Sequence, residues 1–428
     1  MAHDAPYPDF YKDPQVIDQP REYFAQMRAI HPVVKEAYHG SMIVSGYDEV
    51  SEVLTSRDDT FSSAVSVLGP LPGLPFTPEG DDIREQLDHH RDLMPWTTHL
   101  VCFDGDKHAR HRALLTSLLT FKRLKANEEY LVELVDKLID EFQESGTCEV
   151  VKQFAHKVST YAISDILGIS MKDRFELLEL LGASPSQIDG DAVHKVGPDP
   201  LIFLKERFDS YILDRQAEPR GDLLSDLANA RFKDGSAPSS ERLAELARFL
   251  FGAGQDTTSR LMAMAIRKLG DDLDLQERLR REPARIGDFL EEVMRIDPPV
   301  KAIYRVAQKS TEIGGVQTPA GTVIAVSLTG ANNDPRHFED PDRFDIDRPA
   351  LRDHMAFSRG AHGCLGAPLA RLEARVAIER LLARTSVIRI SEDHHGRPGE
   401  RRYRFEPTYS FRNMAELHIA FEPAEVMA

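Results

Sequence analysis

The chain is poor in cysteine and has no long apolar run. Its 428 residues include only three cysteines, Cys102, Cys148 and Cys364, and so small, odd and scattered a set does not build a disulfide framework. No stretch of about 20 apolar residues is present, so no membrane-spanning helix is expected. The first residues also lack the charged and then apolar segments of a signal peptide. We therefore expect a cytoplasmic protein.

Basic residues are also scarce relative to acidic ones. The 53 Lys and Arg stand against 70 Asp and Glu, which gives a net charge of −17. Phosphate binding needs a basic footprint, so nucleic acid is not expected as a partner. The motifs GxxxxGK[ST], GxGxxG, HExxH and GxSxG are absent. The chain is therefore not expected to bind its own flavin or nicotinamide through a nucleotide fingerprint.

Hydrophobic periodicity predicts a mainly α fold with a minor antiparallel β region. Apolar residues recur at three- and four-residue spacing over about residues 106–300, which is typical of amphipathic helices. The segments of about 30–60 and 300–428 are richer in strand patterns. We find no internal repeat and no clear boundary, so residues 1–428 are predicted to form a single domain.

Some individual elements can be predicted from local signals. Residues 33–46 surround a His-Gly turn and predict a hairpin, and the stretch GGVQTPAGTVIAVSL at 314–328 predicts another. Long helices are expected over about 239–269 and 367–384. Two irregular stretches are interpreted as mobile lids over a site, namely residues 61–104 and 183–200.

Cys364 lies between glycines just before the helix predicted at 367–384. A helix N-terminus offers free N–H groups and a positive dipole, which lower a thiol pKa and stabilise the thiolate. Gly360, Gly363 and Gly366 would let the backbone approach a large planar ligand closely. This setting favours an anionic sulfur ligand. The alternative is a buried structural cysteine.

The stretch from Phe357 to Gly366 resembles the haem-binding loop of the cytochrome P-450 monooxygenases, F-x-x-G-x-H-x-C-x-G. Every specified position matches, although Ser358 stands where a second glycine is common. The chain is similar to the soluble bacterial members, actinobacterial ones among them. The resemblance implies the cytochrome P-450 fold, with haem b between a long central helix and the cysteine-bearing loop. It also implies that the Cys364 thiolate is the axial ligand of the iron and that Phe357 and Gly366 contact the cofactor.

A second motif, Ala253-Gly-Gln-Asp-Thr-Thr258, falls midway along the helix expected at 239–269. Ala253 and Thr257 are four residues apart and share one helix face, and the threonine hydroxyl can bond the Ala253 carbonyl. The resemblance makes this the oxygen-activation groove, in which Thr257 and Asp256 are the catalytic proton-handling pair and Ala253 lies against haem. The alternative is a helix kink without chemistry.

Glu292 and Arg295 form a third motif at a three-residue spacing. The spacing alone favours a solvated surface pair worth a few tenths of a kcal/mol. The resemblance implies instead a buried structural pair that supports the cysteine loop together with a downstream arginine. Asp342-Arg343-Phe344 matches that position, so Arg343 is predicted as the third member.

His108 and Arg112, at a four-residue helical spacing, form the fourth motif. In the resembling family these two side chains, with those matched here by Arg305 and His362, hold the haem propionates. Buried carboxylates need such donors, because burial of an unpaired charge is prohibitive. The alternatives are an exposed basic face and a zinc site at His108 and His111, although no second ligand pair has zinc-site spacing.

The motifs together imply a haem-thiolate monooxygenase that inserts one oxygen atom of O2 into a hydrophobic small molecule, such as a terpenoid, steroid-like or aromatic compound. Electrons are expected from a separate ferredoxin and ferredoxin reductase, because the chain has too few cysteines for a cluster of its own. The alternatives are a peroxygenase or haem isomerase and a non-catalytic haem sensor or carrier. A basic docking patch for the ferredoxin is predicted from Lys107, Arg110, Arg359, Arg371 and Arg375.

The resemblance also predicts which residues contact the substrate. They are mainly apolar, which indicates a hydrophobic ligand. The candidates are Leu100, Val101, Leu250, Ala253, Val300, Ile303, Tyr409 and Ser410.

Overall fold

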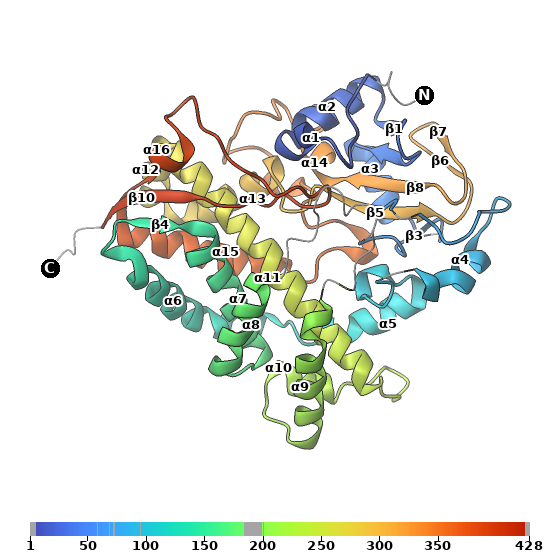
Figure 1. The fold of residues 1–428 in the computed structure, drawn as a ribbon, viewed down its shortest axis with the longest axis horizontal. Coiled ribbons are helices and arrows are strands. Elements are labelled where there is room, and N and C mark those ends of the chain that lie inside the picture. Colours follow the sequence, from blue (N-terminus) through green and yellow to red (C-terminus); the bar gives the residue numbers. More distant parts are fainter. Residues whose placement is uncertain are drawn as a thin grey trace.

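The computed structural model describes residues 6–423 except residues 58, 68, 72, 95, 184–198 and 200. Helices form most of the described chain, and small sheets flank them (Figure 1). The mainly α fold with a minor β region is therefore confirmed. The lid predicted at 183–200 lies almost entirely outside the described residues.

The helices fall into a long set and a short set. The long set comprises α2 (Pro20–Ile30), α5 (Gly105–Thr116), α6 (Phe121–Gln143), α7 (His156–Leu167), α8 (Met171–Ala183), α9 (Lys205–Ala217), α11 (Ser240–Asp271), α13 (Ile286–Ile296) and α15 (Ala367–Arg384). The short set comprises α1 (Pro14–Asp18), α3 (Tyr47–Thr55), α4 (Arg84–His90), α10 (Leu223–Ala228), α12 (Leu273–Arg281), α14 (Leu328–Asn332) and α16 (Glu392–His395).

Helix α11 crosses the middle of the molecule (Figure 1). It begins where predicted, because the Ser239 hydroxyl accepts a hydrogen bond from the backbone N–H of Arg242 at 3.2 Å and caps the first turn. Its 32 residues make it about 48 Å long at the standard rise. Its length lets it contact both helical cores and carry the residues between them.

The largest sheet has five strands in the order β1-β2-β8-β5-β3. Its strands are β1 (Val33–Lys35), β2 (Met42–Val44), β8 (Val323–Ser327), β5 (Ala302–Ala307) and β3 (Phe61–Ser62). The hairpin predicted at 33–46 is confirmed, with Val34 opposite Ile43. The pairing of β2 with β8 is parallel, so the sheet is not wholly antiparallel as expected.

The hairpin predicted within 314–328 is wrong. Gly314 and Gly315 form the turn of a hairpin that begins earlier, between β6 (Thr311–Ile313) and β7 (Val316–Thr318). The following strand β8 pairs with β2 and β5 instead of with β7. The two glycines adopt the left-handed φ that a tight turn needs, and the Pro319-Ala-Gly turn then redirects the chain into another sheet.

A three-stranded antiparallel sheet joins the C-terminal segment to the helices. Its order is β4 (Thr147–Glu149), β10 (His418–Pro423) and β9 (Thr385–Ile390). Two predicted segments prove more helical than expected. Helix α3 occupies part of the segment 30–60, and residues 61–104 contain α4 and two single-turn helices, Arg91–Leu93 and Leu100–Cys102.

Helix α11 divides its buried side chains between two hydrophobic cores. Residues from Leu243 to Phe251 pack in one core with α9 and α10. Residues from Leu261 to Leu269 pack in the other with α6, α7, α13 and α15. The stretch between them, 252–260, belongs to neither core. This gap in the apolar packing contains Ala253, Asp256 and Thr257.

Candidate active site

Backbone hydrogen bonds in the loop before α15 fix the position of Cys364. The Cys364 N–H donates to the Phe357 carbonyl at 2.8 Å, and the Gly363 N–H donates to the Gly360 carbonyl at 3.1 Å. Gly360 has φ +69°, and a Cβ there would lie 2.2 Å from the Leu54 carbonyl oxygen of α3. Only glycine therefore fits at Gly360. Ser358 also has a left-handed φ, 59°, which is costly for serine and explains why glycine suits this position.

Cys364 is the exposed cysteine of the three, whereas Cys102 and Cys148 are buried. The surrounding protein raises the pKa of the Cys364 thiol by burial, although the backbone N–H groups of Gly366 and Ala367 at the start of α15 lower it. The expected net lowering of this pKa is therefore wrong for the protein without a bound metal, because desolvation outweighs the helix N-terminus. A metal cation at the sulfur would reverse this balance.

A cluster of cationic and imidazole groups lies near the cysteine loop. Arg305 is buried, and its guanidinium donates to Ser66 Oγ and to the Tyr304 carbonyl, both at 2.7 Å. Arg112 donates to the Gly363 carbonyl at 2.5 Å. Within the described residues, neither guanidinium forms an ion pair with a carboxylate, although the charge of Asp104 acts on Arg305. The lack of an ion pair is unusual for the buried Arg305.

Two histidines complete this cluster. The rings of His108 and His362 stack with centroids 3.9 Å apart. Burial, followed by the charge of Arg112, lowers the pKa of His108 to about 4. Burial and the charge of Arg305 lower the pKa of His362 to about 2. Both imidazoles are thus neutral near pH 7, and His362 Nε2 already contacts Ser63 Oγ at 3.1 Å.

The donor set fits the haem that the loop motif implies. One buried and one half-buried arginine without an ion-pair partner, next to two neutral imidazoles, are suited to a ligand carrying two carboxylates. The exposed thiol would supply an iron ligand. Phe357 adds an aromatic wall, and the Arg371 guanidinium lies 4.4 Å from its ring centroid. All the predicted propionate contacts therefore lie together in the structure.

On α11, Thr257 Oγ1 donates to the Ala253 carbonyl at 2.9 Å, as predicted from the spacing. Ala253 is exposed although it lies midway along a central helix. Asp256 forms an ion pair with Arg260 one turn further along. The sequence interpretation missed Arg260, because a basic residue at this spacing normally signals a solvated helix face.

Glu292 and Arg295 form a fully buried ion pair, with Arg295 Nε 2.7 Å from Glu292 Oε2. The prediction of Arg343 as the third member is wrong. The Arg343 side chain is 70% exposed and faces Asp345, whereas the Arg348 side chain is 7% exposed and lies 3.4 Å from Glu292 Oε1. Both arginines follow an aspartate, and the chain turns at Asp340, which has φ 44°, so the local motif could not separate them.

The sequence interpretation also overlooked Glu291. Its carboxylate accepts from Arg371 Nε at 2.6 Å and contacts His354 Nε2 at 2.9 Å. Burial alone would raise its pKa, but the bonds from Arg371 and His354 lower the pKa of Glu291 to about 2. Glu291 therefore links α13 to α15, whereas Glu292 links α13 to the segment that contains Asp345 and Arg348.

Three of the five residues in the predicted basic docking patch form ion pairs within the protein. Arg110 pairs with Asp234 at 2.8 Å, and Arg371 pairs with Glu291. Arg375 lies 2.9 Å from Glu379 and also pairs with Glu128. Arg359 donates to Tyr47 Oη and the Asp353 carbonyl. Lys107 lies over the Phe103 ring at 4.3 Å. Lys107 and Arg359 thus form no ion pair in the described chain, and the docking of a ferredoxin on these five residues stays a prediction.

The predicted substrate contacts lie on different packing surfaces. Leu100 and Leu250 belong to one core cluster, together with partly buried neighbours. Val300 and Ile303 pack against the sheet cluster that includes Val44 and Ile324. Tyr409 packs against the N-terminal cluster, with its ring 5.3 Å from that of Tyr11. Common contact of these residues, and of Val101, Ala253 and Ser410, with a substrate stays a prediction.

The zinc interpretation finds no support in the part of the chain that the structure describes. There, no group of three His, Cys, Asp or Glu side chains is arranged to hold a metal ion. His111 Nδ1 instead contacts the Lys107 carbonyl at 2.7 Å. No helix among the described residues is long and apolar enough to cross a bilayer.

Comparison with known proteins gives consistent matches. A profile of the family described as cytochrome P-450 matches residues 203–397. The 6-deoxyerythronolide B hydroxylase of Saccharopolyspora erythraea is 30% identical over 90% of this chain and 93% of its own length. The biotin biosynthesis cytochrome P-450 of Bacillus subtilis is 29% identical over 95% and 98%. The substrate-free structure of the Mycobacterium marinum cytochrome P-450 CYP150A6 is 44% identical, with a TM-score of 0.91 over 97% and 99% of the two chains.

Proposed function

This chain belongs to the cytochrome P-450 family of monooxygenases, and from that premise we propose that it holds haem b through Cys364 and oxygenates a hydrophobic small molecule. One observation carries the proposal: an exposed cysteine at the start of α15 lies near two arginines and two histidines that form no ion pair in the described chain. That set matches a metal-bound macrocycle with two acidic groups.

Each residue has a part that its geometry supports. Cys364 would supply the thiolate, and Arg112, Arg305, His108 and His362 would bind the propionates. The bound cofactor supplies the activation of dioxygen. Thr257 would orient a proton at its hydroxyl, since that hydroxyl is held by the Ala253 carbonyl, and Asp256 would deliver protons to it.

The intact Asp256-Thr257 pair supports a monooxygenase over a peroxygenase or a carrier, because those functions do not need protons delivered to bound oxygen. We assign the electron supply to a separate ferredoxin and its reductase, since three cysteines, one of them Cys364, are too few for a cluster in this chain. The substrate is assigned as hydrophobic from the apolar character of most predicted contacts. A related structure, P450BioI, was solved with a fatty-acid-ligated acyl carrier protein, which is one example of an apolar ligand in this fold.

Carbon monoxide binding to the reduced protein tests the assignment. Thiolate ligation displaces the Soret absorption of the carbon monoxide complex far to the red, so we expect that band in the wild type and its loss in Cys364→Ala. Cys102→Ala and Cys148→Ala are matched controls, because both cysteines are buried, and they should retain the band. Absence of the band from the wild type, or its persistence in Cys364→Ala, would refute the proposal.

A further inference from the structure

Helix α7 carries a row of buried polar side-chain atoms that have no hydrogen-bond partner in the described chain. His156 Nε2, Thr160 Oγ1 and Ser164 Oγ are buried without a hydrogen-bond partner in the described chain. They are spaced by four residues and so lie on one helix face. Each such atom costs about 1–3 kcal/mol, so three of them along one face indicate a requirement other than stability.

This face is turned toward the catalytic stretch of α11. A Cβ on Gly254 would meet the Ile163 side chain at 3.4 Å, which fixes one point of contact between the helices. His156 interacts electrostatically with Asp256 and Arg260, which lie further along α11. As Ile163 follows His156 in α7, the two helices run antiparallel here. Thr160 then lies between these points, near the level of Thr257.

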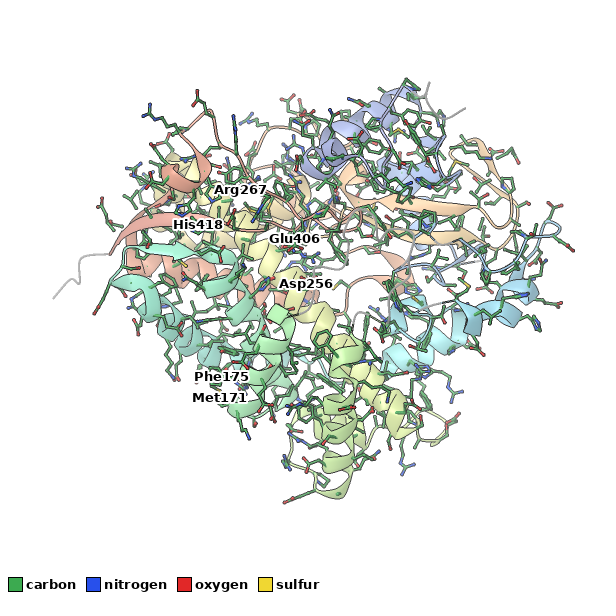
Figure 2. All side chains as sticks on the ribbon, viewed as in Figure 1. Met171, Phe175, Asp256, Arg267, Glu406 and His418 are labelled. Atoms are coloured by element: carbon green, nitrogen blue, oxygen red, sulfur yellow. The ribbon has the colours of Figure 1, made fainter. Side chains whose placement is uncertain are left out.

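The neighbours of Asp256 extend this polar region. Asp256 pairs with Arg260, whose side chain is 7% exposed and whose Nε and Nη1 atoms are buried without partners. The Arg260 guanidinium lies 4.3 Å from the centroid of the Phe411 ring, in the C-terminal segment. Figure 2 labels Asp256 on α11 and Glu406 on the C-terminal segment that passes beside it.

His156 connects this interior to solvent. The residue as a whole is only partly buried, whereas its Nε2 atom is buried. The charged groups that face it are Asp256 and Arg260 of α11, Glu406 of the C-terminal segment and Glu149 at the end of β4. Burial lowers the pKa of His156, and the charges of Asp256 and Glu406 oppose that lowering. The charge of Arg260 adds to the lowering, so the pKa of His156 lies below its ordinary value and the imidazolium gives up its proton readily.

We propose that His156 is a positioning residue that returns protons to Asp256, with Glu406 as the group that recharges it from solvent. The step balances as a proton transfer: protonated His156 loses one proton to the Asp256 carboxylate, and Asp256 passes one to the Thr257 hydroxyl as that hydroxyl releases its own proton toward the reaction site. His156 then regains one proton from water through Glu406. Between successive proton transfers, the ion pair with Arg260 holds the Asp256 carboxylate in place. This inference rests on the proposed function, because it supplies the pair Asp256 and Thr257.

Magnetic resonance titration of isotope-labelled histidine tests the electrostatic interaction between His156 and Asp256 directly. The spectra are recorded on the reduced, carbon monoxide-bound protein, and the His156 signal is assigned by its loss in His156→Gln. Asp256→Asn should lower the titration midpoint of His156 by about one pH unit, since removal of a nearby anion disfavours imidazolium. Glu406→Gln should lower it in the same direction. An unchanged midpoint in both variants would overturn the proposal.

The rate of dioxygen consumption with a surrogate ferredoxin and reductase provides the second readout. In the wild type this rate should fall as pH rises through the His156 midpoint. In His156→Gln this fall of the rate with rising pH (the pH limb) should disappear. The rate at low pH should also drop by about 100-fold, the lower end of the range for proton transfer. His395→Gln is the matched control, because His395 is a buried histidine whose Nε2 accepts from the His418 N–H at 2.9 Å, far from Asp256 in sequence; it should keep the limb.

The outcomes separate the two proposals. A wild type without the red-displaced carbon monoxide band refutes the proposed function. A wild type that has the band, with a His156→Gln variant that keeps the full rate and the same pH limb, refutes the role of His156 alone. If His156→Gln does not fold, the midpoint shifts in Asp256→Asn and Glu406→Gln still decide the question, because the histidine is then intact.

Discussion

Lys301 is a charged side chain that the fold buries almost completely. It is 1% exposed, and its Nζ donates to the Thr408 carbonyl in the C-terminal segment. Burial, followed by the charge of Arg412, lowers the pKa of Lys301 to about 7. The neighbouring Asp297 already forms ion pairs with Arg412 at 3.1 Å and with Arg267 at 3.2 Å. The ammonium form is therefore poorly compensated, and the amine can lose its proton near neutral pH.

A pH titration of stability tests this assignment. Between about pH 7 and pH 10 the unfolded chain holds a proton on Lys301 that the folded chain has lost, so the free energy of unfolding of the wild type should rise with pH in this window. Lys301→Met removes this contribution and should flatten the rise. Urea unfolding of both proteins at several pH values measures the slopes. Equal slopes would mean that Lys301 keeps its proton.

Helix α13 supports the cysteine loop through two successive glutamates. Glu291 contacts Arg371 of α15 and His354, whereas Glu292 contacts Arg295 of its own helix and Arg348. Adjacent residues on a helix point about 100° apart, so one turn of α13 holds two segments that flank Cys364. The buried carboxylates persist because each has at least two charged or strongly polar partners.

The corrected third member of the Glu292 network can be tested by a pair of alanine variants. Arg348→Ala should lower the free energy of unfolding by about 3 kcal/mol, because it removes one partner from a buried carboxylate. Arg343→Ala should change it by less than about 0.5 kcal/mol, as expected for an exposed side chain. Denaturant unfolding followed by circular dichroism compares them. A larger effect for Arg343→Ala would restore the original assignment.

The two ends of the described chain meet at Arg412. This side chain pairs with Asp297 at the end of α13, donates to the Ile17 and Asp18 carbonyls of α1, and lies 3.4 Å from the centroid of the Phe405 ring. A guanidinium has donors enough for all three polar partners in one plane. Arg412 thus holds the N-terminal helix, the support helix and the C-terminal segment together, and that segment carries Glu406 and Phe411 toward α11.

Hydrogen exchange can show this coupling between distant segments. Arg412→Ala should speed amide exchange in α1 and in residues 405–416 by at least about tenfold, since each 1.4 kcal/mol of lost local stability corresponds to that factor. The core half of α11 should be unaffected. Arg404→Ala is the control, because Arg404 is 71% exposed and contacts only Glu416 at 3.3 Å among the described charges. Equal exchange in the two variants would contradict the role of Arg412.

Local motifs predicted the elements around Cys364 well. The helix expected at 367–384 is α15 with the same bounds, and the hydrogen bond from Thr257 to Ala253 follows from a four-residue spacing. The hairpin predicted within 314–328 failed because a pair of glycines marks a turn without saying which later strand the chain joins. The docking patch could not be judged from local motifs, because carboxylates that pair with Arg371 and Arg375 lie on other helices as well as on α15.

The order of residues along the chain was sufficient for the thiol at a helix start, the threonine–aspartate pair and the helical pair of His108 and Arg112, because each depends on neighbours within a few residues. The approach of Arg305 and His362 to that helical pair required the folded molecule. The choice of Arg348 over Arg343, the pairing of Asp256 with Arg260 beside His156 and the meeting of Arg412 with α1 required the folded molecule. Contacts between distant segments depend on how helices pack and where the chain turns, and no short stretch of sequence encodes that geometry.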